Sequence, residues 1–502
     1  MLASVASSTL LGVVGRPVTV EVHVSDGLPG FTIVGLPDAS CREARDRVRA
    51  ALLSSSLPWP LKRVTVNLAP SGVRKEGSGF DVAIAVALLA AAGELSLKHI
   101  DGIGCIGELG LDGSIRRVPG IVPLSHALEA SSIVVPMACV HEAIAARNGM
   151  VRGVRDLAEL VAALKGINPW PVVPAPPDAI EELSSFDMSD VRGHATGRLA
   201  LEVAAAGGHH LLMTGPPGAG KTMLARRLPA LLPDLTPAES LESTCIHSAA
   251  DQLMPTCGML RRPPLRAPHH TASAVAIIGG GTSAMRPGEV SLAHNGVLFL
   301  DEIAEFPSFV VDTLRVPIEE GVVRISRARG SVCMPARFLM IAAMNPCPCG
   351  EANPILCRCS PAQRQRYERR LSGPLLDRFD LRLTLDRPAT SDLVGGAPGE
   401  STAVVKQRVA MARQIAAERG SRTNSQLTLQ RLRAVAPLSS AGRQVLERAL
   451  NTGRLSARGM HRVHSVALTI ADLGQHVGPL TSDHVATALC LRQELRCSTA
   501  AA

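Results

Sequence analysis

The chain has 502 residues, of which 46% are hydrophobic and 19% charged, so it can bury large cores, and its length is typical of roughly three domains. Aromatic residues make up only 2%, which argues against a protein that binds single strands by stacking bases on aromatic rings. The longest apolar run, Val82 to Ala92, is too short to cross a bilayer, and the first residues lack the basic segment of a signal peptide. We therefore expect a cytoplasmic protein without membrane segments.

The formal net charge of +8 is unevenly distributed along the chain. Residues 401–502 contain fourteen Lys and Arg and five Asp and Glu, a net +9, whereas the first 400 residues sum to −1. This asymmetry is typical of a protein that binds a polyanion, and nucleic acid is the most common one. A solvated helical surface is an equally good interpretation of the same residues.

The first part of the chain is predicted to be an α/β domain. Val18–Val24 alternates apolar and polar residues, as a half-buried strand does. Helices are expected over Ala39–Ser54, with Asp38 as the capping residue, and over the apolar run Asp81–Ala92.

A proline-rich segment marks the first domain boundary, because closely spaced prolines hold a chain extended and stiff. Four regions are predicted from this boundary and from the motifs described below. They are an amino-terminal domain (1–165), a linker (166–180), an ATPase core (181–385) and a helical carboxy-terminal lid (386–502).

A phosphate-binding loop, the P-loop, lies early in the predicted core. It fits the pattern G-x-x-x-x-G-K-[ST] at every fixed position, with the residues Gly215, Pro216, Pro217, Gly218, Ala219, Gly220, Lys221 and Thr222. The apolar Leu211–Thr214 before it suits a buried strand, and the residues after it are typical of a helix. Glycines let backbone N–H groups surround an anion, Lys221 can reach the β- and γ-phosphates, and the Thr222 hydroxyl suits Mg²⁺. The sequence therefore predicts that the chain binds ATP with Mg²⁺.

Two later strands end in residues suited to hydrolysis. Val297–Leu300 is followed by Asp301, a candidate Mg²⁺ ligand, and by Glu302, a candidate base that polarises the attacking water. Leu339–Met344 is followed by Asn345, where a residue that senses the γ-phosphate is expected. Arg378, near the end of the core, is a candidate arginine finger that acts on the nucleotide of a neighbouring subunit.

Two histidines between these motifs do not predict a metal site. His269 and His270 are adjacent, and adjacent side chains point apart on regular secondary structure. We expect structural or inter-subunit roles for them.

A β-hairpin is predicted over 321–334, with its turn at 328–330. Three arginines gather near the turn: Arg324, Arg327 and Arg329. Arginine suits phosphate forks, so we expect DNA contacts here, with protection of an exposed strand edge as the alternative.

Four cysteines stand within thirteen residues, and they are Cys347, Cys349, Cys357 and Cys359. Four thiolates can hold Zn²⁺ tetrahedrally if the loop between the pairs folds back. The C-x-C spacing is less common than C-x₂-C, so reduced, unliganded thiols are the alternative interpretation. A zinc ion here would fix Asn345 and Arg378 relative to each other.

Taken together, the motifs resemble those of the AAA+ ATPases of the Mg-chelatase-like group, over essentially the whole chain. The stretches that carry the likeness are 215–222, 266–271, 293–302, 345–350, 375–380, 455–462 and 469–472. Residues 74–81 and 106–113 likewise resemble a Lon-protease-type domain. A protease of that type needs a serine nucleophile and a lysine base, but Ser78 is displaced from the expected position and 120–124 contains no lysine. We therefore expect an inactive, scaffold-like domain.

The resemblance implies a homo-oligomeric ring, a hexamer, in which the hairpin faces the central pore. It also implies that Arg458, in the helical lid, is a second sensor of the nucleotide, and that the activity is branch migration of DNA by a helicase, as used in natural transformation and recombination. Two alternatives stay open. One is a Mg-chelatase-type subunit that drives metal insertion through a partner, and the other is a protein-remodelling adaptor.

Overall fold

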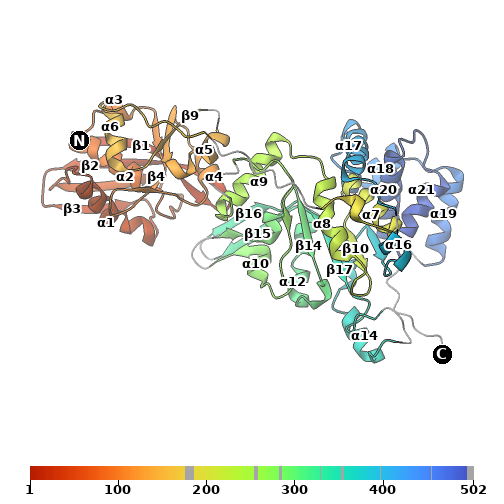
Figure 1. Cartoon of the computed structure of the whole chain (residues 1–502). Helices are drawn as coiled ribbons and strands as arrows, with labels where there is room; N and C mark the ends of the chain where they lie inside the picture. The colour runs from red at the N-terminus through yellow and green to blue at the C-terminus, as the bar shows by residue number, and fades with distance from the viewer. Residues whose placement is uncertain are drawn as a thin grey trace.

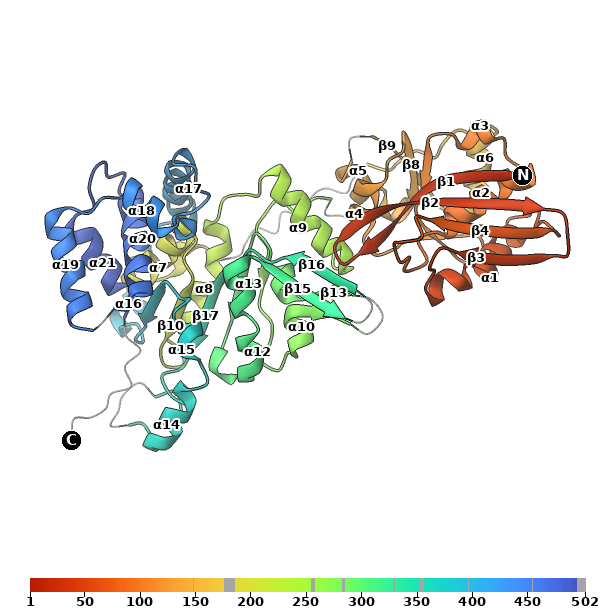
Figure 2. The same ribbon diagram turned by 180° about the vertical axis from the view of Figure 1, so that it is seen from behind.

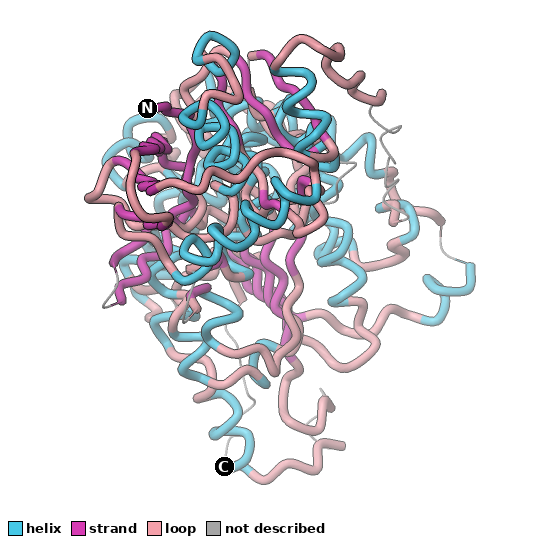
Figure 3. Tube along the Cα trace, turned by 90° about the vertical axis from the view of Figure 1, so that its left-hand side faces the viewer, coloured by secondary structure: helices cyan, strands magenta, loops and turns pink. Residues whose placement is uncertain are grey.

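The computed structural model describes residues 1–147, 149–175, 186–253, 258–281, 285–327, 330–351, 356–395, 397–453 and 455–493. The molecule is elongated, with the amino-terminal domain at one end, the core in the middle and the helical lid at the other end (Figure 1). Figure 3 views the same arrangement with the amino-terminal domain toward the viewer. The predicted α/β class, with a helical carboxy-terminal region, is confirmed. Among the described helices, none has the length and apolarity needed to span a bilayer.

The amino-terminal domain is built on a seven-stranded mixed sheet of order β3-β4-β2-β1-β5-β8-β9. The first two strands form a long antiparallel hairpin, from Leu2↔His23 to Leu11↔Val14. The predicted helices are present, and the Asp38 carboxylate caps the first by accepting the Cys41 N–H at 2.8 Å. The elements are β1 Leu2–Leu11, β2 Val14–Ser25, β3 Gly30–Val34, α1 Ala39–Ser54, β4 Arg63–Ala69, α2 Asp81–Ala92, α3 Leu97–Ile100, β5 Ile103–Cys105, β6 Glu108–Leu109, β7 Ile115–Arg116, α4 Ile121–Ala127, β8 Ser132–Pro136, α5 Val140–Ala145, β9 Met150–Val154 and α6 Leu157–Leu164.

The core contains a five-stranded parallel sheet of order β11-β14-β17-β10-β18. A separate two-stranded sheet, β15 with β16, forms the predicted hairpin and pairs from Val322↔Pro335 to Arg327↔Gly330. The core elements are α7 Ala195–Gly207, β10 Leu211–Thr214, α8 Lys221–Leu231, α9 Pro237–Ala249, β11 Leu265–Arg266, α10 Ala274–Ile278, β12 Gly279–Gly280, β13 Arg286–Pro287, α11 Glu289–Leu292, β14 Val297–Leu300, α12 Ser308–Asp312, α13 Arg315–Glu320, β15 Val322–Arg327, β16 Gly330–Pro335, β17 Leu339–Met344, α14 Pro361–Glu368, α15 Gly373–Leu376 and β18 Leu381–Thr384.

Alternate residues of the core strands enter two different hydrophobic clusters, as the period of two along a strand requires. Leu211 and Met213 of β10 pack with α7, α8 and the lid helices. Leu212, between them, packs on the opposite face with α9, the segment 303–314 and the β15–β16 hairpin. Both faces of the sheet are therefore covered, which explains why its strands are continuously apolar.

The lid consists of helices that share one hydrophobic cluster with a face of the core sheet, through residues such as Val409 and Val463. Four of the fourteen basic residues after residue 400 pair with acids of the core. Ion pairs join Lys406 to Asp234, Arg408 to Glu202, Arg422 to Glu239 and Arg462 to Asp380. Part of the charge asymmetry seen in the sequence therefore joins the lid to the core. The helices are α16 Thr390–Gly395, α17 Thr402–Glu418, α18 Leu429–Val435, α19 Ser440–Asn451, α20 Ala457–Leu473 and α21 Ser482–Cys490.

Candidate nucleotide site and its surroundings

The P-loop connects the carboxyl end of β10 to the amino terminus of α8, as predicted. The backbone takes the left-handed conformation at Gly218 (φ 81°) and at Gly220 (φ 77°), immediately before the helix begins at Lys221. Residues other than glycine rarely adopt these angles, so the glycines permit the tight loop. The first N–H groups of α8 lack helical partners and lie where an anion can bind them.

Lys221 and Asn345 meet at this end of the sheet. β10 and β17 are parallel neighbours in the register Thr214↔Met344, so the residues that follow each strand lie side by side. The Lys221 ammonium donates to the Asn345 carbonyl oxygen Oδ1 at 3.1 Å, and to the carbonyl oxygens of Gly215 (2.6 Å) and Pro216 (3.0 Å). Burial lowers the pKa of Lys221, and Asp301 and Glu302 counteract this effect. A charged ammonium is thus held at the loop by oxygen atoms that a phosphate would replace.

Thr222 and Asp301 form the candidate Mg²⁺ site. The Thr222 hydroxyl donates to Asp301 Oδ2 at 2.7 Å. Adjacent ligands of an octahedral Mg²⁺ at 2.0–2.1 Å lie about 2.9 Å apart, so these two oxygens are already at a suitable separation. Both are hard oxygen donors, and the pair fits a magnesium ion that brings further ligands from water and phosphate.

Glu302 stands beside the metal site and is available to a ligand. Its side chain is 52% exposed, and its backbone N–H donates to Asp301 Oδ1 at 3.0 Å. Its backbone is left-handed (φ 51°), which is uncommon for a residue other than glycine. His270 Nδ1 lies 3.8 Å from Glu302 Oε2, so one histidine of the pair contacts the candidate base. Sequence reasoning missed this role, because the contact joins segments about thirty residues apart.

Arg378 is not at the P-loop of its own chain. It precedes β18 at the edge where the parallel strands begin, whereas the P-loop lies at the edge where they end. Its guanidinium donates to Glu319 Oε1 at 2.6 Å and to the Pro374 carbonyl oxygen, and its side chain is 10% exposed.

Arg458 is a residue of the lid helix α20. It is exposed in the first turn of α20, and no partner is found for it among the described residues. Arg462, one turn later, pairs with Asp380, which immediately precedes β18. The structure therefore brings together Lys221, Thr222, Asp301, Glu302 and Asn345. It leaves Arg378 at the opposite edge of the sheet and Arg458 on the lid, one turn from the arginine that pairs with Asp380.

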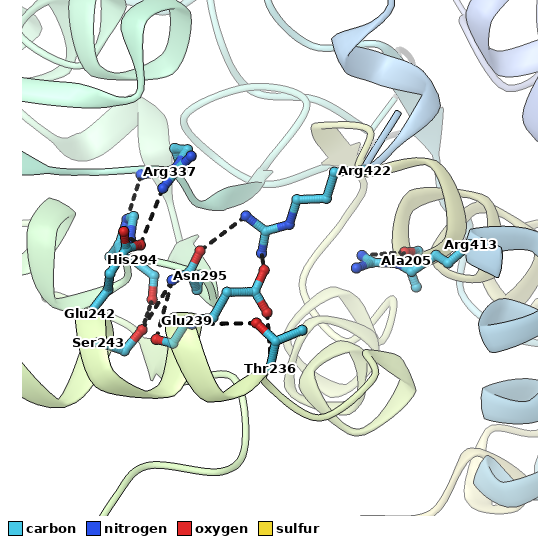
Figure 4. A network of polar contacts seen from close by, with 10 residues as sticks. All are labelled: Ala205, Thr236, Glu239, Glu242, Ser243, His294, Asn295, Arg337, Arg413 and Arg422. Carbon is cyan, nitrogen blue, oxygen red and sulfur yellow. Dashed lines mark hydrogen bonds and ion pairs between the residues drawn. The ribbon is translucent and has the colours of Figure 1, made fainter. Parts of the chain in front are cut away.

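A polar network at that opposite edge joins the lid to the starts of the catalytic strands (Figure 4). Arg422, from the lid, donates to Asn295 Oδ1 at 3.1 Å and pairs with Glu239 of α9. Asn295 is buried and left-handed (φ 57°), and its amide donates to Ser243 Oγ at 3.3 Å. Its N–H donates to the Arg337 carbonyl oxygen at 2.7 Å. The network therefore joins the lid to the residues just before β14 and β17, the two strands that end at Asp301 and Asn345.

The four predicted cysteines gather into one cluster. The sulfur of Cys347 lies 3.3 Å from that of Cys349 and 3.5 Å from that of Cys357, and all four sulfurs lie within 4.8 Å of one another. Around Zn²⁺ with Zn–S bonds of about 2.3 Å, tetrahedral sulfurs stand about 3.8 Å apart, so the spacing fits this metal. A hydrogen bond from the Glu351 backbone and, to a smaller extent, one from the Cys347 side chain lower the pKa of Cys349 to about 6. Burial instead raises the pKa of Cys347 to about 12.

The arginines of the predicted DNA-binding hairpin are only partly within the described residues. Arg324 lies on β15, has a 59% exposed side chain and pairs with Glu320. Arg327 belongs to the described strand, but its side chain lies outside the described part, and Arg329 lies outside the described residues altogether.

Ser78, the displaced serine of the amino-terminal domain, donates to the carboxylate of Glu108. The nearby Lys75 is fully buried, donates to the Pro70 carbonyl oxygen, and has its pKa lowered by burial. The described hydrogen bonds thus give Ser78 an acid partner rather than a lysine.

Three family models match the chain in succession. The model of the magnesium chelatase subunit ChlI matches 187–393, a second model of subunit ChlI matches 20–138, and that of the ChlI C-terminal region matches 399–492. Together they follow the order of the amino-terminal domain, core and lid. The chain belongs to the Mg-chelatase ChlI-like family of AAA+ ATPases.

Members of this family that match along nearly their whole length are bacterial proteins. An uncharacterized protein of Mycobacterium tuberculosis is 45% identical over 494 residues, which cover 97% of this chain and 98% of the relative. The uncharacterized protein YifB of Escherichia coli is 43% identical over 493 residues, covering 98% and 97%. The competence protein ComM of Haemophilus influenzae is 41% identical over 502 residues, covering 99% and 98%.

The magnesium chelatases themselves are more distant. The magnesium-chelatase 38 kDa subunit of Acidiphilium rubrum is 28% identical over 201 residues, which cover 36% of this chain and 52% of the relative. The similarity to this chelatase subunit thus covers about a third of the chain, whereas the similarity to ComM and YifB covers nearly all of it.

Proposed function

We propose that this AAA+ ATPase is a ring-forming motor that hydrolyses ATP to move branched DNA, as a branch-migration helicase used in integrating or recombining DNA. The observation that carries the proposal is the separation of the catalytic groups. Lys221, Thr222, Asp301, Glu302 and Asn345 form one half of a site, whereas Arg378 lies at the opposite edge of the sheet.

Within one subunit, each residue has a separate task. Lys221 and the N–H groups of the loop hold the β- and γ-phosphates, and Thr222 and Asp301 hold Mg²⁺, which neutralises charge on the phosphate oxygens. Glu302 orients and deprotonates the attacking water. Asn345, at the end of β17, hydrogen-bonds the γ-phosphate and so distinguishes bound ATP from ADP. His270, 3.8 Å from Glu302, holds that carboxylate in position.

A neighbouring subunit supplies the missing cations. Arg378 lies at the edge opposite the P-loop, and Arg458 lies on α20 one turn before Arg462, which pairs with Asp380. In a ring this edge would meet the P-loop side of the next subunit. For Arg378 to reach a γ-phosphate, its guanidinium must exchange Glu319 for the phosphate. Such an exchange would couple ATP binding in one subunit to the breaking of the Arg378–Glu319 ion pair, which joins α13 to the segment after α15 in its neighbour. A hexamer is the ring size that the family resemblance supports.

DNA is the substrate that the hairpin and the relatives favour. Arg324 is exposed on β15, and Arg327 and Arg329 follow it in the sequence toward the tip, where guanidinium groups can bind phosphates in pairs. The full-length similarity to the competence protein ComM supports a role in handling DNA, and the partial similarity to chelatase subunits gives less support to metal insertion.

A zinc ion held by Cys347, Cys349, Cys357 and Cys359 is part of the proposal. Cys347 lies two residues after Asn345, so tetrahedral thiolate ligation would fix the backbone at the end of β17. The metal would have a structural role, since four protein ligands leave no position open for a substrate.

The decisive experiment measures branch migration on a synthetic four-way DNA junction with ATP and Mg²⁺. We expect ATP-dependent conversion by the wild-type chain, at least tenfold less by Lys221→Ala, and stimulation of ATP hydrolysis by the junction that declines as salt rises. ATP hydrolysis without any effect of DNA on its rate would contradict the DNA assignment and favour a protein-remodelling adaptor or a chelatase-type subunit.

A further inference from the structure

The tip of the first hairpin of the amino-terminal domain is buried in the core rather than in its own domain. Val13, between β1 and β2, is 4% exposed. It belongs to the hydrophobic cluster that contains Val323, Val332 and Met334 of the β15–β16 hairpin. Figure 2 shows β15 and β16 directed toward the ends of β1 and β2.

Gly12 is the point of closest approach. Its backbone is left-handed (φ 65°), and a Cβ placed on it would lie 2.3 Å from Val332 Cγ1 and 3.4 Å from Met334 Cε. No real Cβ tolerates the first distance, so the backbone of the β1–β2 tip lies directly against the side chains of β16. The contact is therefore a close-packed one between two hairpins that are more than 300 residues apart in sequence.

A second contact holds the amino-terminal domain against the core. The N–H of Gly120, just before α4, donates to the Ser248 carbonyl oxygen of α9 at 2.9 Å, and the Val122 N–H donates to Ser248 Oγ at 3.2 Å. Arg117 pairs with Glu142 in its own domain and with Asp251 just after α9, at 3.4 Å for the latter. These polar contacts restrain rotation of the domain about the hairpin contact.

The β15–β16 hairpin needs such a support. It forms a two-stranded sheet of its own, and an isolated hairpin of that kind is only marginally stable in water. Its inward side chains, Val323, Ile325, Val332 and Met334, are all buried, and the β1–β2 tip covers part of them. Removing the tip would expose apolar side chains of the hairpin, Val332 and Met334 among them.

We propose that the amino-terminal domain acts as the support of the β15–β16 hairpin, with Gly12 and Val13 as positioning residues that set its angle and rigidity. The inference deepens the proposed function, since the tip of this hairpin is the part assigned there to DNA. The domain thus contributes to the motor without any peptidase chemistry, by holding the DNA-contacting element at a fixed place relative to α9 and the core.

Hydrogen–deuterium exchange on the full chain tests the support directly and without DNA. In Val13→Asp, we expect amides of 322–327 and 330–335 to exchange at least tenfold faster than in the wild type, while those of β10 and β14 stay unchanged. The matched control is Val14→Asp, which places the same charge at the next residue, where the side chain is 46% exposed. Hairpin exchange equal to wild type in Val13→Asp overturns the proposal.

Gly12→Ala distinguishes local loosening of the hairpin from global unfolding, because it adds one methyl group at the contact instead of a buried charge. We expect faster exchange confined to the hairpin, and protection retained throughout the hairpin would again overturn the inference. The functional readout is ATP hydrolysis: unchanged without DNA, but with at least a fivefold smaller stimulation by a four-way junction in Val13→Asp. If the wild type shows no stimulation, the DNA assignment fails, whereas the exchange experiment still decides the support.

Discussion

Replacement of Glu302 by Gln tests the catalytic core of the proposed mechanism. The substitution keeps the size of the side chain and removes only the charge and basicity of the carboxylate. The contacts that would bind ATP and Mg²⁺, Lys221 with Asn345 and Thr222 with Asp301, do not include the Glu302 side chain. ATP affinity should therefore stay within about twofold of wild type, and the exposed position predicts an unchanged melting temperature.

The expected loss of turnover follows from the role of a general base. Such a group contributes about 10²- to 10⁴-fold in rate, which corresponds to about 3–5 kcal/mol of activation free energy. Steady-state phosphate release would measure kcat, and titration with a fluorescent ATP analogue would measure affinity. Glu305→Gln is the matched control, since Glu305 is exposed, follows by three residues and pairs with Arg370 instead of facing the site. A kcat for Glu302→Gln within about fivefold of wild type would refute the assignment of the base.

Three further predictions concern other parts of the molecule. Mixing Arg378→Ala chains with Glu302→Gln chains should restore ATPase activity above that of either alone, because intact sites form between unlike subunits; additive activities would exclude action in trans. Protein purified without chelator should contain about one zinc per chain by mass spectrometry of metals, with loss in Cys357→Ser and none in the exposed control Cys490→Ser. Burial lowers the pKa of His210 to about 4, and its Nδ1 accepts the Met340 N–H at 3.0 Å, so the neutral form is the native one. Stability should therefore fall as pH drops from about 6.5 through 4, by up to about 1.4 kcal/mol per pH unit, and His210→Asn should lose less over this range in urea titrations.

Most of the local structure could be predicted from the sequence. The helix Asp81–Ala92 and the strand Leu211–Thr214 have the predicted bounds. The length of an apolar run and the residues that flank it distinguish a buried helix from a buried strand. The meeting of Thr222 with Asp301 was also predictable, since the P-loop and the acids after β14 follow parallel strands of one sheet. The proximity of His270 to Glu302 was not, because no periodicity connects the two segments.

The charge of the lid shows the opposite case. The sequence reveals an excess of arginine after residue 400, and it is equally consistent with a polyanion site and with a solvated surface. The structure shows a third outcome for several of these residues, such as Arg408 and Arg462, which pair with carboxylates of the core. The sequence gives the number of charged side chains, but which of them form ion pairs depends on the distances that folding sets between them.

The sequence by itself determined the elements, their order and the chemistry of the P-loop, because these depend on neighbours along the chain. Only the tertiary structure decided which side of the sheet each functional group occupies. Arg378 lies at the edge where the strands begin, and Gly12 lies against Val332 and Met334 across more than 300 residues. These positions follow from the parallel register of the core sheet and from the packing of distant apolar residues into one hydrophobic cluster. Neither can be read from a local sequence pattern.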